Sequence, residues 1–286
     1  MSLGKEQKKA EEIIRTALDC GINYFDTADL YDFGTNEEIV GKALKDIRKE
    51  IILATKVGNK PNPSQDGWTW DASKSYIKDA VKQSLQRLQT DYIDLYQLHG
   101  GTMEDNHEEA IEAFEELVKE GVIRYYGISS IRPAVIDSYL DKSNIVSVMM
   151  QYSLLDRRPE EYAGLIAEKG ASIIARGPVA KGILSDKLLE KASSHVKENG
   201  FLDYTYKELE EILGNVKEKF SSRSIQEVAL QYILAHGEVG AAIPGASSPE
   251  QVRQNANAVN GQPLANDELQ FLKEITKANQ YVQHRI

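Results

Sequence analysis

Short apolar runs alternate with amphipathic helical stretches along almost the whole chain. The runs are too short for helices, and several are rich in the β-branched residues that strands prefer. They predict strands near 23–25, 51–54, 92–98, 122–128, 145–150, 171–175 and 239–243. Because two parallel strands need a crossover connection between them, repeated strand–helix units of this size predict a parallel sheet covered by helices.

Apolar residues at helical spacing predict the helices between these strands. The expected helices lie near 5–20, 36–46, 77–88, 107–120, 133–140, 158–169, 224–236 and 266–278, with another after 248. Three of them begin with capping signals, namely Thr35 with Glu38, Ser224 with Glu227, and Ser248 with Pro249 and Gln251.

Two stretches, 57–71 and 177–223, read as long loops, and loops of this length inside a compact domain are usually functional. Trp68 and Trp70 lie in the first of them. Aromatic side chains on such a loop either wall a pocket or pin the loop to the barrel, and the sequence favours neither.

One closed (β/α)8 barrel, formed as a single domain by residues 1–286, is the favoured architecture, ahead of a doubly wound open sheet. A dinucleotide-binding open sheet carries a glycine-rich turn after its first strand, and this chain has none. Seven of the eight barrel strands are identifiable, because the chain opens on a helix. Without a further strand, the strands near Asn23 and Val239 would have exposed edges, which invite pairing with another chain or local disorder.

The net charge limits the classes of partner that the chain can bind. With 34 basic and 44 acidic residues the formal net charge is −10, which argues against a nucleic-acid or anionic-membrane partner. Cys20 is the only cysteine, so a disulfide within the chain and a thiolate metal cluster are excluded, and a reducing cytoplasm is expected. His195, His236 and His284 have no partners at metal-ligand spacing, so no metal site is predicted. A monomer or weak oligomer is expected.

Ionisable side chains follow three successive predicted strands. Asp26, Lys56 and His99 each come at the end of an apolar run, and Tyr31 lies on the loop after Asp26. Each residue alone is better explained by capping, solvation or packing. In a barrel, however, the carboxyl ends of the strands meet at the face where reactive groups lie. The four side chains together therefore indicate a site.

The chemistry of this set is coherent. A tyrosine, with a reference pKa of ~10, exchanges protons poorly at neutral pH. A nearby lysine ammonium favours the phenolate, an aspartate holds the lysine charged, and a histidine orients a substrate oxygen. The set suits proton delivery to a carbonyl oxygen. Because none of these side chains donates a hydride, a nicotinamide cofactor is implied.

These residues resemble a known family. The segment Gly21-Ile-Asn-Tyr-Phe-Asp26-Thr-Ala-Asp-Leu-Tyr31 resembles the aldo-keto reductase signature G-x3–4-D-[ST]-A-x2-Y. Ile52-Leu-Ala-Thr-Lys56 and Asp94-Leu-Tyr-Gln-Leu-His99 are similar to that family's lysine and histidine strands. The resemblance implies that Tyr31 is the general acid and base, that Lys56 and Asp26 tune it, and that His99 orients the carbonyl.

The resemblance also implies a cofactor site. Ser129 and Ser130, with Gln151, match the residues that hold the nicotinamide carboxamide. Arg176, followed by Gly177 and Pro178, stands where the family has an aromatic residue on the nicotinamide, and its planar guanidinium can stack instead. The adenosine-phosphate segment is matched by Gly245, Ser247, Ser248, Gln251 and Asn255. Family members that bind NADPH usually add Lys or Arg there; NADPH is expected, with NADH as the other possibility.

Three functions follow as hypotheses. The first is an NADPH-dependent reductase of aldehydes or ketones, a small carbonyl compound being its substrate. The second is a catalytically silent barrel that binds a nucleotide or a protein partner, which the missing first strand favours. The third, a barrel lyase or glycosidase, needs a carboxylate pair or phosphate-loop glycines at the strand ends, and neither is clear.

Overall fold

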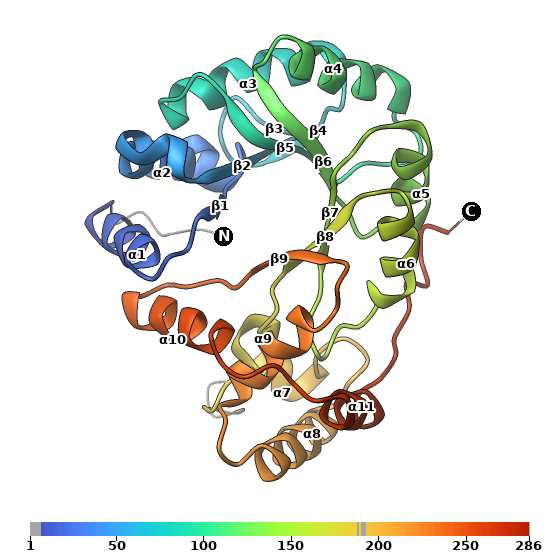
Figure 1. Cartoon of the computed structure of the whole chain (residues 1–286). Coiled ribbons are helices and arrows are strands. Elements are labelled where there is room, and N and C mark those ends of the chain that lie inside the picture. Colours follow the sequence, from blue (N-terminus) through green and yellow to red (C-terminus); the bar gives the residue numbers. More distant parts are fainter. Residues whose placement is uncertain (1–6, 188, 190–192, 286) are drawn as a thin grey trace.

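The computed structural model describes residues 7–187, 189 and 193–285. Seven parallel strands form one sheet in the order β1-β2-β5-β6-β7-β8-β9, which is their order along the chain (Figure 1). The strands are β1 (Tyr24–Asp26), β2 (Ile52–Val57), β5 (Ile93–His99), β6 (Ile123–Ser129), β7 (Ser147–Gln151), β8 (Ser172–Arg176) and β9 (Val239–Ile243). The sheet curls into a nearly closed barrel, as the sequence predicts.

Helices surround this sheet on its outer side (Figure 1). They are α1 (Gln7–Asp19), α2 (Thr35–Leu44), α3 (Lys74–Leu88), α4 (His107–Lys119), α5 (Pro133–Lys142), α6 (Glu160–Glu168), α7 (Ser194–Asn199), α8 (Tyr206–Lys219), α9 (Ile225–Leu234), α10 (Pro249–Val259) and α11 (Asn266–Ile275). Short 3-10 segments include η1 (Tyr31–Gly34), η2 (Lys45–Glu50) and η3 (Ala180–Gly182).

The apolar core has two layers, because alternate strand residues face opposite sides of a sheet. Ala54, Leu95, Met149 and Ile174 form the cluster inside the barrel. A much larger cluster fills the space between the sheet and the helices, and it includes Tyr96, Phe114 and Ile128.

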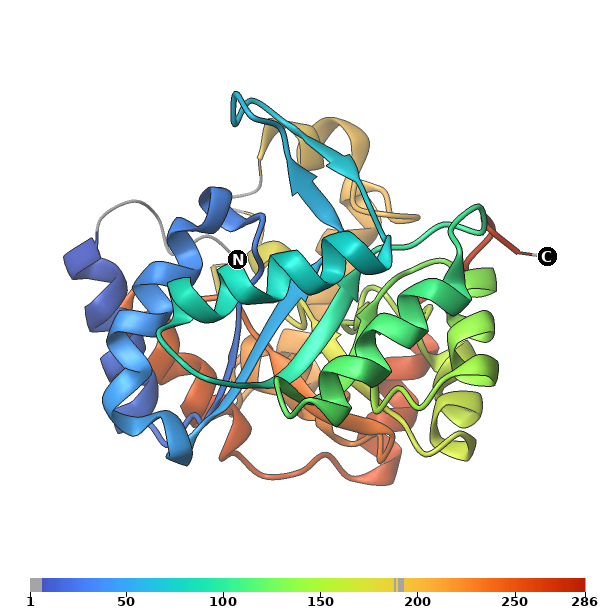
Figure 2. The ribbon, with the colours of Figure 1, turned by 90° about the horizontal axis from the view of Figure 1, so that it is seen from above.

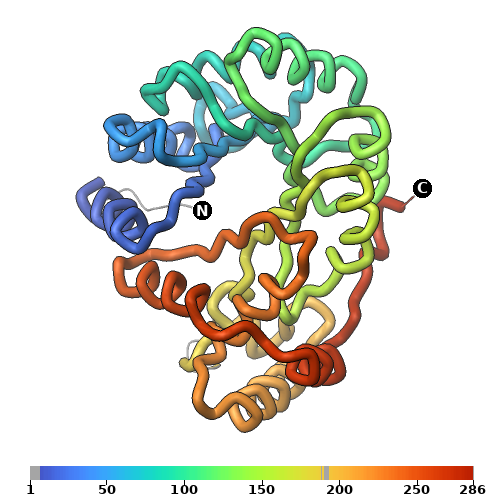
Figure 3. Tube along the Cα trace, viewed as in Figure 1, coloured from blue at the N-terminus to red at the C-terminus, as the bar shows by residue number. Residues whose placement is uncertain are grey.

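The first and last strands, β1 and β9, have no strand pairing with each other in the described residues. The two ends of the sheet are joined by helix packing instead, since Ile13 and Ala17 of α1 form one buried cluster with Ala246 and Val252. Figure 3 shows α1 and α10 side by side across this opening.

The two predicted loops contain secondary structure. The stretch 57–71 holds an antiparallel hairpin of β3 (Asn59–Pro61) and β4 (Trp68–Trp70), which stands above one end of the barrel (Figure 2). The stretch 177–223 holds α7 and α8, and its residues 188 and 190–192 lie outside the described part.

Two of the three predicted helix caps are confirmed and one is wrong. Ser224 and Ser248 cap α9 and α10, because each hydroxyl accepts a hydrogen bond from the backbone three residues on. The Thr35 capping box is wrong. Thr35 is already the first residue of α2, and Gly34, with a φ of 92°, is the capping residue. A positive φ suits glycine, which lacks a Cβ.

In the described part of the chain, no helix has both the length and the apolar character needed to cross a membrane.

Candidate active site

Asp26, Lys56 and His99 lie at or near the carboxyl ends of β1, β2 and β5. These three strands are neighbours in the sheet, and their register places Lys56 beside Gln97. The Lys56 side chain is fully buried, and its Nζ forms an ion pair with Asp26 Oδ2. The same Nζ donates a hydrogen bond to the Thr27 carbonyl oxygen at 2.6 Å. A buried ammonium is stable only with such partners.

Tyr31 completes the group from η1, the turn that follows β1. The Lys56 Nζ lies 5.1 Å from the centroid of the Tyr31 ring. The ring of His99 meets the Tyr31 ring edge-on, with centroids 6.0 Å apart and planes at 87°. The structure therefore brings together all four residues that the sequence predicts, at the end of the barrel where strand carboxyl ends meet.

His99 is held in its neutral form. Burial, followed by the positive charges of Lys56 and Arg176, lowers its pKa to about 3. Its Nδ1 is buried without a hydrogen-bond partner, and Asn59 Nδ2 donates to its carbonyl oxygen at 3.2 Å. A neutral imidazole in this position keeps a ring nitrogen available for a hydrogen bond to a ligand.

Gln97 is a member of this site that the sequence reasoning missed. It is fully buried on β5, and its Nε2 donates to Asp26 Oδ1 at 3.3 Å. Asp26 thus has one carboxylate oxygen on Lys56 and the other on Gln97. The available signal was the period of two along a strand, because Gln97 precedes His99 by two residues and so shares its face.

The Trp70 side chain packs over the carboxyl ends of β2 and β5. A Cβ added at Gly58 would lie 2.6 Å from the Trp70 ring, and one at Gly100 would lie 3.2 Å from it, so the indole covers both glycines. Its Nε1 donates to Asp105 Oδ1 at 2.7 Å. Trp70 therefore pins the hairpin, whereas Trp68 is 52% exposed.

A polar layer lies behind β1 and β2. Glu37 of α2 is fully buried, accepts a 2.5 Å hydrogen bond from Thr55 Oγ1 and pairs with Arg87 at 2.7 Å. Asp29 is buried beside it. Burial, followed by repulsion from Glu37, raises the pKa of Asp29 to about 8.

The residues predicted to hold a nicotinamide occupy the next strand ends. Ser129 ends β6 beside His99, and Gln151 ends β7 beside Arg176 on β8. Gln151 Nε2 donates to Asp156 Oδ2 at 3.0 Å. These strand ends offer hydroxyl and amide groups, which fit a carboxamide.

Other members of the predicted set differ in exposure. Ser130 is buried, and its Oγ accepts from the Arg132 backbone at 3.3 Å. Arg176 is exposed, whereas Pro178 is buried, and Gly177 between them has a φ of 67°.

The predicted phosphate segment precedes and opens α10. Gln251 Oε1 accepts hydrogen bonds from Ser247, at 2.7 Å from the backbone and 3.1 Å from the hydroxyl. Asn255 is buried and donates to the Gly245 carbonyl oxygen at 3.4 Å. These contacts hold the turn in one shape at a helix N-terminus, which is an end that favours anions.

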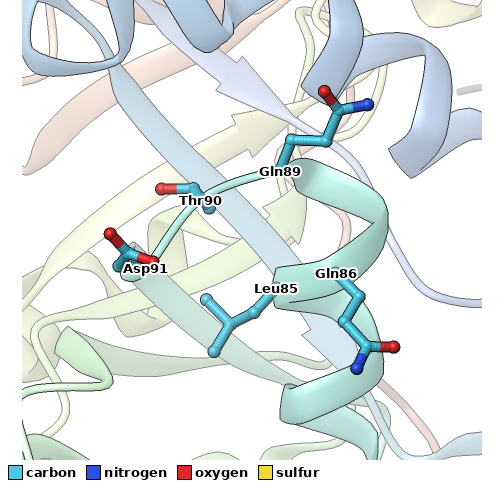
Figure 4. Close-up of a pocket in the computed structure, with 5 residues that line it drawn as sticks. All are labelled: Leu85, Gln86, Gln89, Thr90 and Asp91. Atoms are coloured by element: carbon cyan, nitrogen blue, oxygen red, sulfur yellow. The ribbon is translucent and has the colours of Figure 1, made fainter.

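A shallow depression lies elsewhere, between the end of α3 and the start of β5 (Figure 4). Its lining consists of Leu85, Gln86, Gln89, Thr90 and Asp91. This is the end of the barrel opposite the strand carboxyl ends, and active sites of such barrels lie at the carboxyl ends. Among the described residues, no group of three or more His, Cys, Asp or Glu side chains is arranged to hold a metal ion.

The chain matches the model of the aldo/keto reductase family over residues 1–277. It is 56% identical to the uncharacterized oxidoreductase YqkF of Bacillus subtilis, over all of this chain and 93% of that protein. Its fold superposes on the holo form of the aldo-keto reductase AKR11C1 from Bacillus halodurans with a TM-score of 0.94, at 56% identity and with 100% and 93% of the two chains covered. The aldo-keto reductase yakc [NADP(+)] of Schizosaccharomyces pombe is 31% identical, with 90% of this chain and 79% of that protein covered.

Proposed function

Because this chain belongs to the aldo/keto reductase family, we propose that it reduces aldehyde or ketone carbonyls with NADPH and that Tyr31 donates the proton. The proposal is carried by the buried Lys56, which lies between the Asp26 carboxylate and the Tyr31 ring. Because the desolvation of an ammonium is costly, a buried lysine with a specific charge partner marks a candidate functional site.

Each of the four residues has one task in this reaction. Tyr31 delivers a proton to the carbonyl oxygen, and the charge of Lys56 stabilises the negative charge that the phenol oxygen then gains. Asp26 keeps Lys56 charged and in place. Neutral His99 donates a hydrogen bond that orients the carbonyl. The bound cofactor supplies the hydride.

The cofactor residues are proposed from the same resemblance. Ser129, Ser130 and Gln151 hold the carboxamide, and Arg176, Gly177 and Pro178 lie beside the nicotinamide ring. The phosphate is held by the segment from Gly245 to Asn255, whose Ser247, Ser248 and Gln251 offer polar groups. NADPH is supported by the NADP(+)-named relative, although the segment's cation, Arg253, sits on an exposed position of α10.

The test is the loss of NADPH absorbance with reactive aldehydes such as nitrobenzaldehyde or methylglyoxal. Wild type turns over, and Tyr31→Phe loses at least about a hundredfold in kcat, the usual worth of a positioned general acid. Tyr125→Phe is the control, because Tyr125 is 57% exposed and lies towards the amino end of β6. Undiminished turnover by Tyr31→Phe would remove the proposed acid; cofactor binding without turnover by wild type would support a silent barrel.

The cofactor preference is tested by comparing kcat/KM for NADPH and NADH in the same assay. NADPH is expected to give the higher value. A higher value with NADH would overturn the proposed cofactor and leave the proposed reaction standing.

A further inference from the structure

Gln151 has a fixed orientation before any ligand arrives. Its Nε2 donates to Asp156 Oδ2 at 3.0 Å, and within the described part of the chain no hydrogen bond reaches its Oε1. An ionised carboxylate only accepts hydrogen bonds, so Asp156 selects the NH2 end of the amide. The oxygen of Gln151 is thereby left as an acceptor for a ligand.

Asp156 is itself firmly held. Its side chain is fully buried, and Arg158 donates to its two oxygens from Nε and Nη2, both at 2.7 Å. This fork-like pairing is the strongest geometry that an arginine and a carboxylate form. A pair of backbone hydrogen bonds with Ser153, of 3.2 and 2.9 Å, closes the turn that carries Asp156.

The chain's C-terminal segment covers Arg158. The centre of the Arg158 guanidinium lies 4.8 Å from the ring centroid of Tyr281, whose side chain is nearly buried. This distance is within the range of a cation–π interaction. The Tyr281 hydroxyl has no hydrogen-bond partner, so the ring face carries the contact.

Further contacts fix residues 276–285, here called the tail. Asn279 Oδ1 accepts from the Arg157 backbone at 2.9 Å, and Arg285 Nη2 pairs with Glu161 at 2.7 Å. The His284 carbonyl oxygen accepts from the Ala134 backbone at 3.0 Å, at the start of α5. Figure 3 shows the tail running from α11 past α6 to α5, outside the strands.

We propose that Asp156 is a positioning residue that makes Gln151 accept the carboxamide N–H of a nicotinamide, and that Tyr281 of the tail holds this arrangement through Arg158. The inference rests on the proposed function, because it takes a nicotinamide dinucleotide as the ligand. It adds a link between the tail and cofactor recognition that passes through three successive contacts, Tyr281 to Arg158, Arg158 to Asp156, and Asp156 to Gln151.

Replacement of Asp156 by Asn removes the preference for the NH2 end of the Gln151 amide. An amide offers both a donor and an acceptor, so Gln151 is no longer required to present its oxygen. One hydrogen bond of about 1 kcal/mol is then lost from the complete cofactor, which corresponds to about a fivefold weaker affinity. The affinity of a ligand that has no carboxamide N–H should not change, because that ligand does not form this hydrogen bond.

Three ligands distinguish the loss of the carboxamide contact from a general loss of ligand binding. Dissociation constants are measured by calorimetry for NADP+, for its acetylpyridine analogue, which lacks the amide N–H, and for ADP-ribose 2′-phosphate, which lacks the nicotinamide. Asp156→Asn is expected to weaken NADP+ about fivefold and to leave both other ligands within about twofold of wild type.

A matched pair of variants tests the tail. Tyr281→Leu removes the ring and is expected to reproduce part of the selective loss, because Arg158 loses its cover. Tyr281→Phe keeps the ring and removes only the unpartnered hydroxyl, so its affinities should equal those of wild type. Arg285→Gln breaks a tail contact outside the Arg158 link and should also leave the selectivity unchanged.

The outcomes are distinct. Equal weakening of all three ligands, or unchanged NADP+ affinity in Asp156→Asn, would overturn this inference alone. Equal behaviour of Tyr281→Leu and Tyr281→Phe would remove the tail from it. A wild type that binds none of the three ligands would overturn the proposed function as well.

Discussion

Asp29 shows how burial controls a single side chain next to the proposed site. It lies between Tyr31 and the strand end of β1, with Oδ1 buried and without a hydrogen-bond partner. Burial and the neighbouring Glu37 carboxylate raise its pKa to about 8, so the folded protein keeps it protonated at neutral pH. The unfolded chain, with the ordinary value of 3.8, ionises it.

This difference predicts a pH dependence of stability. The contribution of Asp29 to the free energy of unfolding is complete below about pH 4 and is lost as the pH rises through about 8. Asp29→Asn removes the titration, so its stability should fall less than that of wild type between about pH 5 and about pH 9. Thermal melts at the two pH values check this. Parallel pH profiles for the two proteins would contradict it.

At the scale of single residues, the sequence predicts the ionisable members of the site. Asp26, Lys56 and His99 stand out because ionisable groups follow apolar runs. Gln97 and Asp156 are not recognised from the sequence, because a neutral amide in a strand and an acid in a turn have ordinary structural explanations. Their partners, Asp26 Oδ1 and Gln151, are identified only by three-dimensional proximity.

The hairpin of β3 and β4 contacts the strand ends next to the proposed site, through Trp70 at Gly58 and Gly100. Its strands have three residues each, and Pro61 interrupts any alternating pattern, so the sequence indicates a loop. The stretch 177–223 contains a helix signal in its sequence. Leu209, Ile212, Leu213 and Val216 recur at helical spacing, after a Thr205–Glu208 capping box that the structure contains.

Trp70 and Trp68 are predicted to differ in energetic weight. Trp70→Ala should lower the free energy of unfolding by about 2–3 kcal/mol, because it empties the space over Gly58 and Gly100 and removes the donor to Asp105 Oδ1. Trp68→Ala, at an exposed site, should stay within about 0.5 kcal/mol. Urea unfolding followed by circular dichroism gives both values. Similar losses in the two variants would show that Trp70 is not the anchor.

At the scale of the whole molecule, the barrel architecture follows from the strand–helix rhythm, whereas the way its ends meet does not. The sequence predicts exposed edges on the first and last strands, and in residues 7–187, 189 and 193–285 β1 and β9 are the two ends of the sheet. The packing of α1 on α10 cannot be predicted from the sequence, because small residues such as Ala17 and Ala246 do not reveal which segment they contact.

This packing predicts a coupling between α1 and the proposed phosphate segment. Ile13→Ala and Ile14→Ala should each cost about 2–4 kcal/mol of stability, since both side chains are buried. Only Ile13 shares a cluster with Ala246 and Val252, so only Ile13→Ala should weaken the binding of ADP-ribose 2′-phosphate. Calorimetry at a temperature where both variants are folded compares them. Equal affinities would show that α1 does not support the segment.

The order of the strands in the sheet has a consequence for synthesis on the ribosome. Each strand of the seven-stranded sheet pairs with the preceding strand of that sheet, so the sheet can grow by one unit at a time as the chain emerges. The α1–α10 contact is different, because it joins two helices from opposite ends of the chain and carries a large loop-closure entropy. A nascent chain can therefore assemble most of its sheet early, while the segment proposed to hold the cofactor phosphate is among the last parts to be secured.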